Sequence, residues 1–483
     1  MGVQKNVLGS RVTGAGGSWL EVGFEWLLFV RYEALLFVCF WFTVATIDGL
    51  AVDGRWLWLR LTGRGHAMRM SPGVEALELN GRAAVFVPAW QEAEVIGPMI
   101  AHTLRAWSQR ELRLYIGCYG NDVATVAAAI AAAGKDPRVR IVVHGVEGPT
   151  TKADCLNRLY RALCSDEARS GVRFRSVVLH DAEDMVHPAG LVAIDRALDY
   201  ADYVQLPVRP ELQPHSRWVA GHYADEFLEA HTKDLVVRDN LRAALPAAGV
   251  GCGFSRIMLE KLSRMGRASV GQGPFAAECL TEDYELGVLV TRAGGKGRFL
   301  RLRDSEGALI ATRSFFPAGF DEAVRQKTRW IHGIAFQGWE RLGWHLRPVE
   351  VWMTVRDRRG PLTAMILAIA YVQIFLEGVV LLAGASGVHA SAPIPPHVAV
   401  ILKVNFLFFG WRAALRYAFT AREYGKLEGL RAVLRIPIAN IIAIISGTRA
   451  FANYLRSFSG DPVRWDKTVH DAHPAALNPP VVG

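Results

Sequence analysis

Two long apolar stretches, residues 362–383 and 398–420, constrain the fold of this chain more than any other feature. A membrane-spanning helix needs about 20 consecutive, mostly apolar residues. A third stretch, Trp26–Ile47, reaches that length only if Arg31 and Glu33 extend toward the membrane interface. We therefore expect three membrane-spanning helices.

A fourth apolar run, Ile436–Ile445, is shorter and is bounded by Arg435 and Arg449. Its length favours an interfacial helix over a fourth span. The charged residues Glu377, Lys403 and Arg412 lie inside the longer stretches. Because such charges are unfavourable in lipid, we expect them to face protein or a polar pathway.

The charges of the connecting segments predict the orientation. Arginines are frequent after the first stretch and in "RDRRG" (356–360), whereas residues 384–397 contain neither lysine nor arginine. Since positive loops stay on the cytoplasmic side, residues 50–360 and the C-terminal tail are expected in the cytoplasm. Residues 384–397 are expected outside.

The composition of the chain argues against several kinds of ligand and cross-link. The formal net charge is +9, but no lysine or arginine tract interleaved with aromatics is typical of a nucleic-acid module, so we expect no nucleic-acid partner. Six cysteines without a CxxC pair favour reduced thiols over a zinc site or disulfides. Residues 1–24 lack the pattern of a cleaved secretory signal.

Between about residues 80 and 345, short apolar runs alternate with helical patterns. We expect helices at 92–108, 123–133 and 152–165, and strands at 83–89, 112–118, 138–145, 176–180 and 203–208. This alternation predicts an α/β fold with a largely parallel sheet, whose ligands gather beyond the carboxyl ends of the strands. The expected organisation is an N-terminal segment and span (1–49), a cytoplasmic catalytic domain (50–345), further spans (346–430), and an interfacial helix with a tail (431–483).

The stretch "HDAED" places Asp181, Glu183 and Asp184 directly after an expected strand. One interpretation is a helix N-terminus, where acids complement the helix dipole. The other is a site for Mg²⁺ or Mn²⁺, which take oxygen ligands and share them with substrate phosphates. The motif alone leaves both open.

Three further stretches carry candidate residues. "LTEDYELG" (280–287) contains Glu282 and Asp283 beside a helical pattern, and a capping box fits it poorly because Tyr284 occupies the reciprocal position. "TKADCLNRL" (151–159) offers Lys152 and Asp154, which suit either a binding site or a solvated first helical turn.

"RQKTRWIHG" (325–333) combines Gln326, Arg329 and Trp330. An amide, a guanidinium and a flat aromatic suit holding a diphosphate and stacking on a sugar. The same pattern suits an amphipathic helix that Trp330 anchors at a membrane.

Seven motifs together resemble those of the family 2 glycosyltransferases, in the order seen in processive membrane synthases of the cellulose and hyaluronan type. They are "VFVPAWQEAEVI", "YGNDVAT", "TKADCLN", "HDAED", "GVGCGFSR", "TEDYELG" and "QKTRW", and the resemblance covers roughly residues 20–470. It implies a GT-A-like fold, a nucleotide-sugar donor, a glycan acceptor and Mg²⁺ or Mn²⁺. It further implies a multi-pass protein of the bacterial inner membrane, with an outer-membrane export protein as an expected partner by analogy.

The resemblance also implies roles for single residues. Asp181 and Glu183 resemble the metal-binding Asp-x-Asp element, although the second position is Glu here. Asp283, with Glu282 beside it, resembles the catalytic base. Contacts to the nucleotide sugar are expected from Pro88, Glu92, Asp122, Lys152, Asp154 and Asp181, with Asn121 in place of a commonly doubled acid.

Gln326, Arg329 and Trp330 resemble the element near the acceptor and the diphosphate. Near the end of the chain, Trp465, Thr468 and His470 in "WDKTVH" have the spacing of a gating loop, although an ordinary interfacial tryptophan explains Trp465 equally well.

These roles describe a single displacement with inversion, in which Asp283 removes the proton of an acceptor hydroxyl and the cation and Arg329 neutralise the leaving diphosphate. We expect a polysaccharide synthase that uses a UDP-hexose or UDP-N-acetylhexosamine and couples synthesis to secretion. Two alternatives remain: transfer of one sugar to a polyprenyl phosphate, and a scaffold or phage-receptor component with a vestigial site. The charges in the spans either line a path for the glycan or pair with each other.

Overall fold

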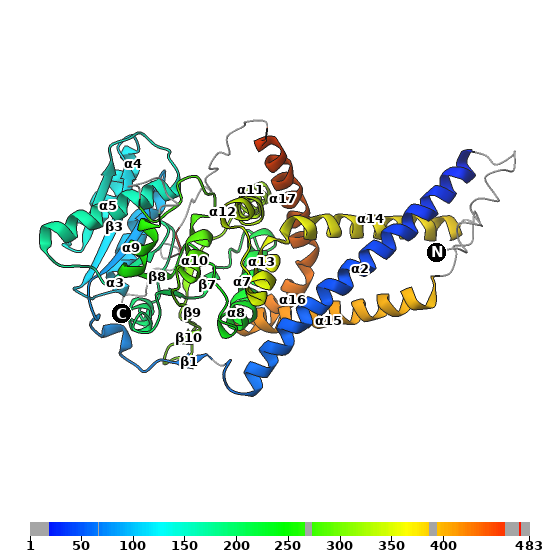
Figure 1. Ribbon diagram of the computed structural model, residues 1–483, viewed down its shortest axis with the longest axis horizontal. Helices are drawn as coiled ribbons and strands as arrows, with labels where there is room; N and C mark the ends of the chain where they lie inside the picture. Colours follow the sequence, from blue (N-terminus) through cyan, green and yellow to red (C-terminus); the bar gives the residue numbers. More distant parts are fainter. Residues whose placement is uncertain (1–18, 66, 266–272, 386–393, 459–472, 475–483) are drawn as a thin grey trace. The chain divides into compact units, whose positions relative to one another are not determined.

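The computed structural model describes residues 19–65, 67–265, 273–385, 394–458 and 473–474 (Figure 1). The chain divides into two compact units. The first comprises Met1–Leu50 and Met365–Arg412, and the second comprises Ala51–Ala364 and Ala413–Gly483.

The second unit is built on a seven-stranded sheet in the order β4-β3-β2-β5-β8-β6-β9. The strands β4, β3, β2 and β5 are parallel, as are β6 and β9, and β8 runs antiparallel to β5 and β6. The bounds are β2 Ala83–Pro88, β3 Leu112–Tyr119, β4 Val139–His144, β5 Ser176–Leu179, β6 Tyr203–Gln205, β8 Cys252–Ser255 and β9 Gly297–Phe299. The predicted α/β fold with a mostly parallel sheet is confirmed.

One expected strand, 203–208, is divided between two sheets. β6 ends at Gln205, and Val208 begins β7 (Val208–Pro210), which pairs with β11 (Thr312–Ser314). Pro207 lies between them and has no N–H to donate to a ladder, so the chain leaves the central sheet there. A second small sheet pairs β1 (Met68–Arg69) with β10 (Leu302–Arg303).

Both faces of the sheet are buried, as expected for parallel strands. Alternate residues of β2 point to opposite sides: Val85 and Val87 belong to one core cluster, and Ala84 and Phe86 to the other. The predicted helices are present as α3 (Ala93–Ala106), α4 (Val123–Ala133) and α5 (Lys152–Ser170). The further elements of this unit are η1 Val74–Ala76, α6 Gly190–Ala197, α7 Val219–Glu229, η2 Ala230–Asp234, α8 Leu235–Asn240, α9 Arg256–Arg264, α10 Glu282–Arg292, α11 Phe320–Ile331, η3 His332–Gln337, α12 Gly338–Leu342, α13 Pro348–Arg358, α16 Lys426–Leu434 and α17 Ile436–Ser457.

The C-terminal helices pack on this unit through a buried arginine. The Arg435 guanidinium is fully buried, lies 2.7 Å from Asp225 Oδ1 of α7 and 2.9 Å from Glu428 Oε2 of α16. α17 contacts α11, and Ser446 Oγ donates to the Val324 carbonyl at 3.2 Å. The helix beginning at Ile436 therefore has one face buried against the domain.

The prediction of a short helix over 436–445 was wrong in extent, because α17 continues through Arg449 to Ser457. Four described helices are long and apolar enough to cross a membrane, namely α2 (Trp19–Leu61), α14 (Gly360–Ala385), α15 (Pro396–Tyr424) and α17. By length and composition, the chain thus offers one span more than the three predicted. The first helix also extends well beyond Trp26–Ile47.

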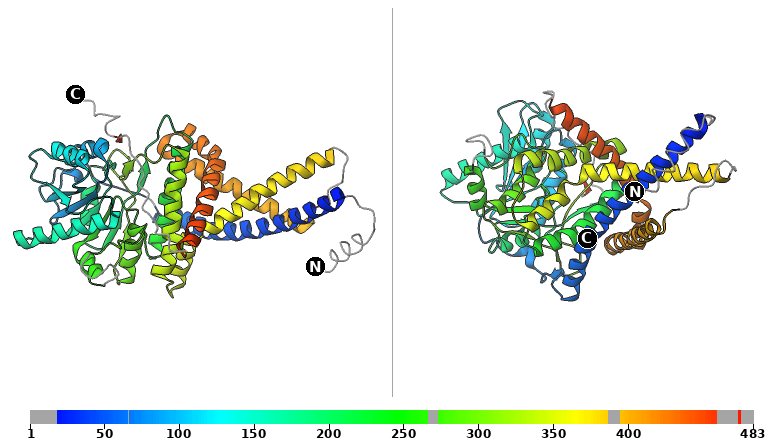
Figure 2. Two further views of the ribbon diagram at one scale, coloured as in Figure 1. Left: turned by 90° about the horizontal axis from the view of Figure 1, so that it is seen from above. Right: turned by 45° about the vertical axis from the view of Figure 1, so that its right-hand side comes forward.

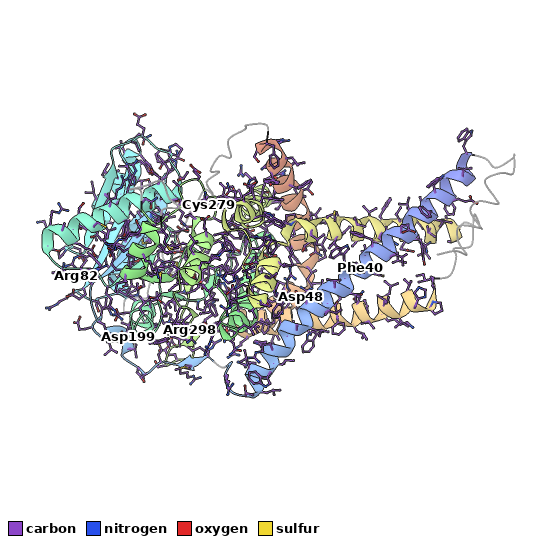
Figure 3. The ribbon with its side chains drawn as sticks, viewed as in Figure 1. Phe40, Asp48, Arg82, Asp199, Cys279 and Arg298 are labelled. Atoms are coloured by element: carbon purple, nitrogen blue, oxygen red, sulfur yellow. The ribbon has the colours of Figure 1, made fainter. Side chains whose placement is uncertain are left out.

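The first unit contains long stretches of α2, α14 and α15, each an unbroken helix (Figure 2). Arg31, which was expected near the membrane interface, is buried with its Nε 3.1 Å from Glu377 Oε1. Lys403 and Arg412 are exposed on α15. Several apolar side chains of α2 are exposed, among them that of Phe40 (Figure 3).

Candidate active site

A cavity in the second unit lies beyond the carboxyl ends of the parallel strands. Its lining includes Pro88 at the end of β2, Tyr119 at the end of β3, and Asp181 shortly after β5. This is the edge where parallel α/β sheets bind their ligands. The fold therefore brings polar side chains from distant parts of the sequence to one place.

The acidic motif after β5 forms a turn, and the next helix begins only at Gly190, so the alternative of a helix N-terminus is wrong. Asp184 is buried, and its Oδ2 accepts hydrogen bonds from Asp181 N at 3.0 Å and from His180 Nδ1 at 2.8 Å. Asp184 thereby fixes the turn, and Asp181 and Glu183 line the cavity.

Lys152 faces the acidic turn from the first turn of α5. Its Nζ lies 2.5 Å from Asp181 Oδ1. Thr151 caps α5, since its Oγ1 accepts from Asp154 N at 3.2 Å. Burial alone would lower the pKa of Lys152, but the surrounding carboxylates of Asp181, Glu282 and Asp283 raise that pKa above its usual value. Lys152 is therefore a fixed positive charge in the cavity.

Asp283 lines the same cavity as Asp181, whereas Glu282 is buried beside it without lining the cavity. Burial raises the pKa of the Asp283 carboxyl, and Lys152 and Arg329 oppose that rise. Burial and the Asp283 charge raise the pKa of Glu282 to about 8. Thr281 occupies the cap position of α10 but makes no side-chain cap hydrogen bond, which agrees with the poor capping box.

The turn of the "GVGCG" motif lies against Asp283. Gly249 has φ of +77°, and a Cβ at this position would lie 2.3 Å from Asp283 Oδ2. Only glycine accommodates both the left-handed backbone and this close approach. The loop and the carboxylate therefore fix each other's position.

α11 contributes Gln326, Arg329 and Trp330 to the lining, on the side formed by the aromatic cluster of Tyr223 and Phe227. The Trp330 ring lies 6.1 Å from the Tyr223 ring and 6.2 Å from the Phe227 ring. Among the described residues, the buried Gln326 Oε1 has no hydrogen-bond partner. Such an atom suits a polar ligand in the cavity.

Of the other residues expected at the nucleotide sugar, Pro88 and Glu92 line the cavity. Asp122 and Asp154 do not: Asp122 Oδ2 accepts from Gln91 N at 2.5 Å, and Asp154 pairs with Arg158 at 3.0 Å. Gln91 has φ of +53°, so Asp122 holds a strained turn next to Glu92. Trp465, Thr468 and His470, expected in a gating loop, lie outside the described residues.

Sequence reasoning missed aromatic residues of the lining. Trp90 and Tyr119 meet edge to face at 5.2 Å between ring centroids, and Phe315 and Phe316 line another part of the cavity. Trp90 lies in "VFVPAWQEAEVI" and Tyr119 in "YGNDVAT", each next to the end of an expected strand. That position could have identified both aromatic residues as part of the cavity lining. Asn121, whose side-chain amide exchanges two 2.9 Å hydrogen bonds with the Gly148 backbone, closes the neighbouring loop.

The donor set fits a cation that relies on its substrate for ligands. In the part of the chain that the structure describes, no group of three or more His, Cys, Asp or Glu side chains forms a metal site. Asp181 and Glu183 place two carboxylates at the cavity. Mg²⁺ and Mn²⁺ sites of this kind use one or two protein carboxylates and complete the coordination with phosphate oxygens and water.

The model of the glycosyltransferase-like family 2 matches residues 80–333, more than half of the 483 residues. The chain belongs to the family 2 glycosyltransferases. All the cavity residues discussed above lie within the matched segment, so the resemblance of the seven motifs is confirmed at the level of the family.

Two curated relatives are 30% identical over 486 residues: bacteriophage adsorption protein B of Escherichia coli K12 and bacteriophage N4 adsorption protein B of Escherichia coli O157:H7. The alignments cover 94% of this chain and 63% of each relative. The chain thus spans less than two thirds of the length of these relatives.

Similar solved structures include the mannosyltransferase PcManGT of Pyrobaculum calidifontis in complex with GDP-Man and Mn²⁺. It is 15% identical, with a TM-score of 0.48 over 84% of this chain and 99% of that one. A second is glucosyl-3-phosphoglycerate synthase of Mycobacterium tuberculosis with Mn²⁺, UDP and phosphoglyceric acid. It is 18% identical, with a TM-score of 0.35 over 57% of this chain and 86% of that one.

Proposed function

We propose that this chain transfers a sugar from a nucleotide sugar to the hydroxyl of a growing glycan, with inversion at the anomeric carbon. One observation carries the proposal: Asp181 and Asp283, about a hundred positions apart in the sequence, line one cavity together with Lys152 and Arg329. The cavity therefore offers an acid-base group and a set of cations that suits a diphosphate leaving group.

In this proposal the Asp283 carboxylate accepts the proton of the acceptor hydroxyl while the hydroxyl oxygen attacks the anomeric carbon. Lys152 and Arg329 face the diphosphate and stabilise the charge that develops as it leaves. Mg²⁺ or Mn²⁺ held by Asp181 and Glu183 would supply further neutralisation of that diphosphate. Trp330 gives the acceptor sugar a flat apolar surface.

The apolar helices suggest where the product goes after synthesis. We infer that the catalytic unit lies on the cytoplasmic side of a bacterial inner membrane and that the polymer leaves through the membrane, where an outer-membrane export protein would receive it. The four helices that are long and apolar enough to span a bilayer support this step, as does the arginine-rich composition around residues 55–69. A UDP-hexose or UDP-N-acetylhexosamine is the donor that we propose.

The test is divalent-dependent consumption of nucleotide sugars by the full chain in lipid nanodiscs, compared with Asp283→Asn. The variant should lose at least 10²-fold in kcat, because it retains shape and loses only the proton acceptor. Unchanged turnover in Asp283→Asn would show that Asp283 is not the catalytic base. If the product is a single sugar on a polyprenyl phosphate, the proposed synthesis of a polymer is wrong. If no nucleotide sugar is consumed, a scaffold role is favoured.

A further inference from the structure

A second concentration of charge lies in the second unit, formed by residues that do not line the catalytic cavity. Arg60 stands in the last turn of α2 and Arg422 in the last turn of α15. Arg301 and Arg303 come from the β10 segment, and the Glu423 carboxylate lies between the side chains of three of these arginines. We refer to Arg60, Arg301, Arg303 and Arg422 as the arginine cluster.

The contacts converge on one carboxylate oxygen. Arg301 Nη2 and Arg422 Nε each lie 3.8 Å from Glu423 Oε1, and Arg303 Nη2 contacts the same atom more closely. The side chains of Arg301 and Glu423 are each 6% exposed, so this part of the cluster is withdrawn from water. Arg60 is near enough for its charge to act on both Arg301 and Arg422.

Three guanidinium groups therefore share one carboxylate, and the charge of the fourth, Arg60, acts on two of them. Two helix C-termini add partial negative charge, about half a unit each, which still leaves an excess of about two positive charges. Burial, and then the charge of Arg303, lower the pKa of Arg301 to about 10, with Arg422 and Arg60 acting in the same direction. Because Glu423 balances only one of these positive charges and Arg422 is 47% exposed, the cluster suits an anion that approaches from its exposed side.

Guanidinium N–H groups without a hydrogen-bond acceptor also indicate that the cluster binds an anion. Arg301 Nη1 and Arg303 Nε are buried and have no hydrogen-bond partner among the described residues. The planar guanidinium presents its donors in a fork that matches the oxygens of a phosphate group. The Glu423 carboxylate pairs with three arginines but accepts no hydrogen bond from either of these donors.

We propose that the arginine cluster binds a phosphate-bearing anion, which is either the headgroup of an anionic lipid or a soluble phosphate. The site is separate from glycosyl transfer. Arg60 and Arg422 end two of the helices that can cross a membrane, and Trp58 and Leu61 beside Arg60 expose 39% and 87% of their surface. Aromatic and apolar side chains next to arginines are typical of the interface where anionic headgroups lie.

The first arm of the test measures thermal unfolding of the full chain in neutral detergent, with sodium phosphate against sodium chloride at equal ionic strength. The second arm compares nanodiscs of phosphatidylcholine alone with nanodiscs containing one quarter phosphatidylglycerol. Binding should raise the unfolding temperature by about 2 °C or more at tenfold saturation. A response to phosphate assigns a soluble ligand, and a response only to phosphatidylglycerol assigns a lipid.

Substitutions test whether the shift in unfolding temperature arises at the arginine cluster. Arg301→Met keeps the apolar stem and removes the buried charge, and Arg422→Gln changes a side chain that is 47% exposed and so leaves folding intact. Both should lose at least half of the shift, whereas Arg264→Met, at a side chain 78% exposed on α9, should keep it. No shift in either arm, or full shifts in Arg422→Gln, would overturn the proposal.

Discussion

The Lys152 ammonium lies 2.5 Å from Asp181 Oδ1 and is the positive charge that the carboxylates of Asp181, Glu282 and Asp283 share. It lowers the pKa of Asp283, against the effect of burial, which raises that pKa. One lysine thus connects the acidic turn after β5 with the first turn of α10. This position explains how the fold keeps several carboxylates close together without a large loss of stability.

Replacing Lys152 with Met should therefore change the pH dependence of the reaction. Without the ammonium the pKa of Asp283 rises further, because the ionised form loses its neighbouring cation. We expect the acid limb of the kcat/KM profile to move up by about one pH unit and KM for the donor to rise about tenfold. The measurement is the pH profile from about pH 5 to 9.

The matched control for this variant is Arg158→Met. Arg158 stands on the same helix and pairs with Asp154, which does not line the cavity. Its profile should overlay that of the unmodified protein. A Lys152→Met profile with an unshifted acid limb would show that Asp283 is not the titrating base.

Glu282 should make the stability of the protein depend on pH. Burial first, and then the Asp283 charge, raise the pKa of Glu282 to about 8, whereas in the unfolded chain it titrates near its ordinary 4.5. Stability is therefore lost as pH rises from about 4.5 to 8, since only the unfolded state ionises in that range. Glu282→Gln should gain free energy of unfolding over the unmodified protein across this range and level off above it.

Chemical denaturation at pH 5, 7 and 9 measures that difference. Glu278→Gln is the control, because Glu278 is exposed. A difference between Glu282→Gln and the unmodified protein that stays constant from pH 5 to 9 would mean that Glu282 titrates normally in the folded state.

Gly249→Ala should disturb the base directly. The new Cβ would lie 2.3 Å from Asp283 Oδ2, at a backbone φ of +77°. We expect kcat to fall at least tenfold through displacement of the carboxylate. Gly171→Ala is the matched control, because its φ is +66° and no atom lies within 4 Å of the added Cβ. Both variants lose about 1 kcal/mol from backbone strain, so only the clash separates them.

Local signals in the sequence were sufficient for the sheet and for most of the polar lining. Apolar runs marked β2 to β5, and acids at strand ends marked Asp181, because both signals depend only on neighbouring residues. Proline explains the one divided strand, since Pro207 separates β6 from β7.

Features that depend on distant partners could not be predicted. Arg435 looked like the polar boundary of an apolar run, yet it is fully buried between Asp225 and Glu428. Arg31 looked like an interfacial residue, yet it pairs with Glu377 of another helix. In both cases the charge is stabilised by a carboxylate whose proximity arises only from the tertiary fold.

Removal of divalent cations should abolish transfer if Asp181 and Glu183 hold the proposed ion. We expect full loss of turnover in EDTA and recovery with Mg²⁺ or Mn²⁺, because the diphosphate then regains its counter-charge. Glu183→Gln keeps the size of a side chain that lines the cavity and removes one anionic ligand, so it should need about tenfold more metal for half-maximal activity. Glu94→Gln, at an exposed position of α3, should respond like the unmodified protein. Turnover that persists in EDTA would assign the neutralisation of the diphosphate to Lys152 and Arg329 alone.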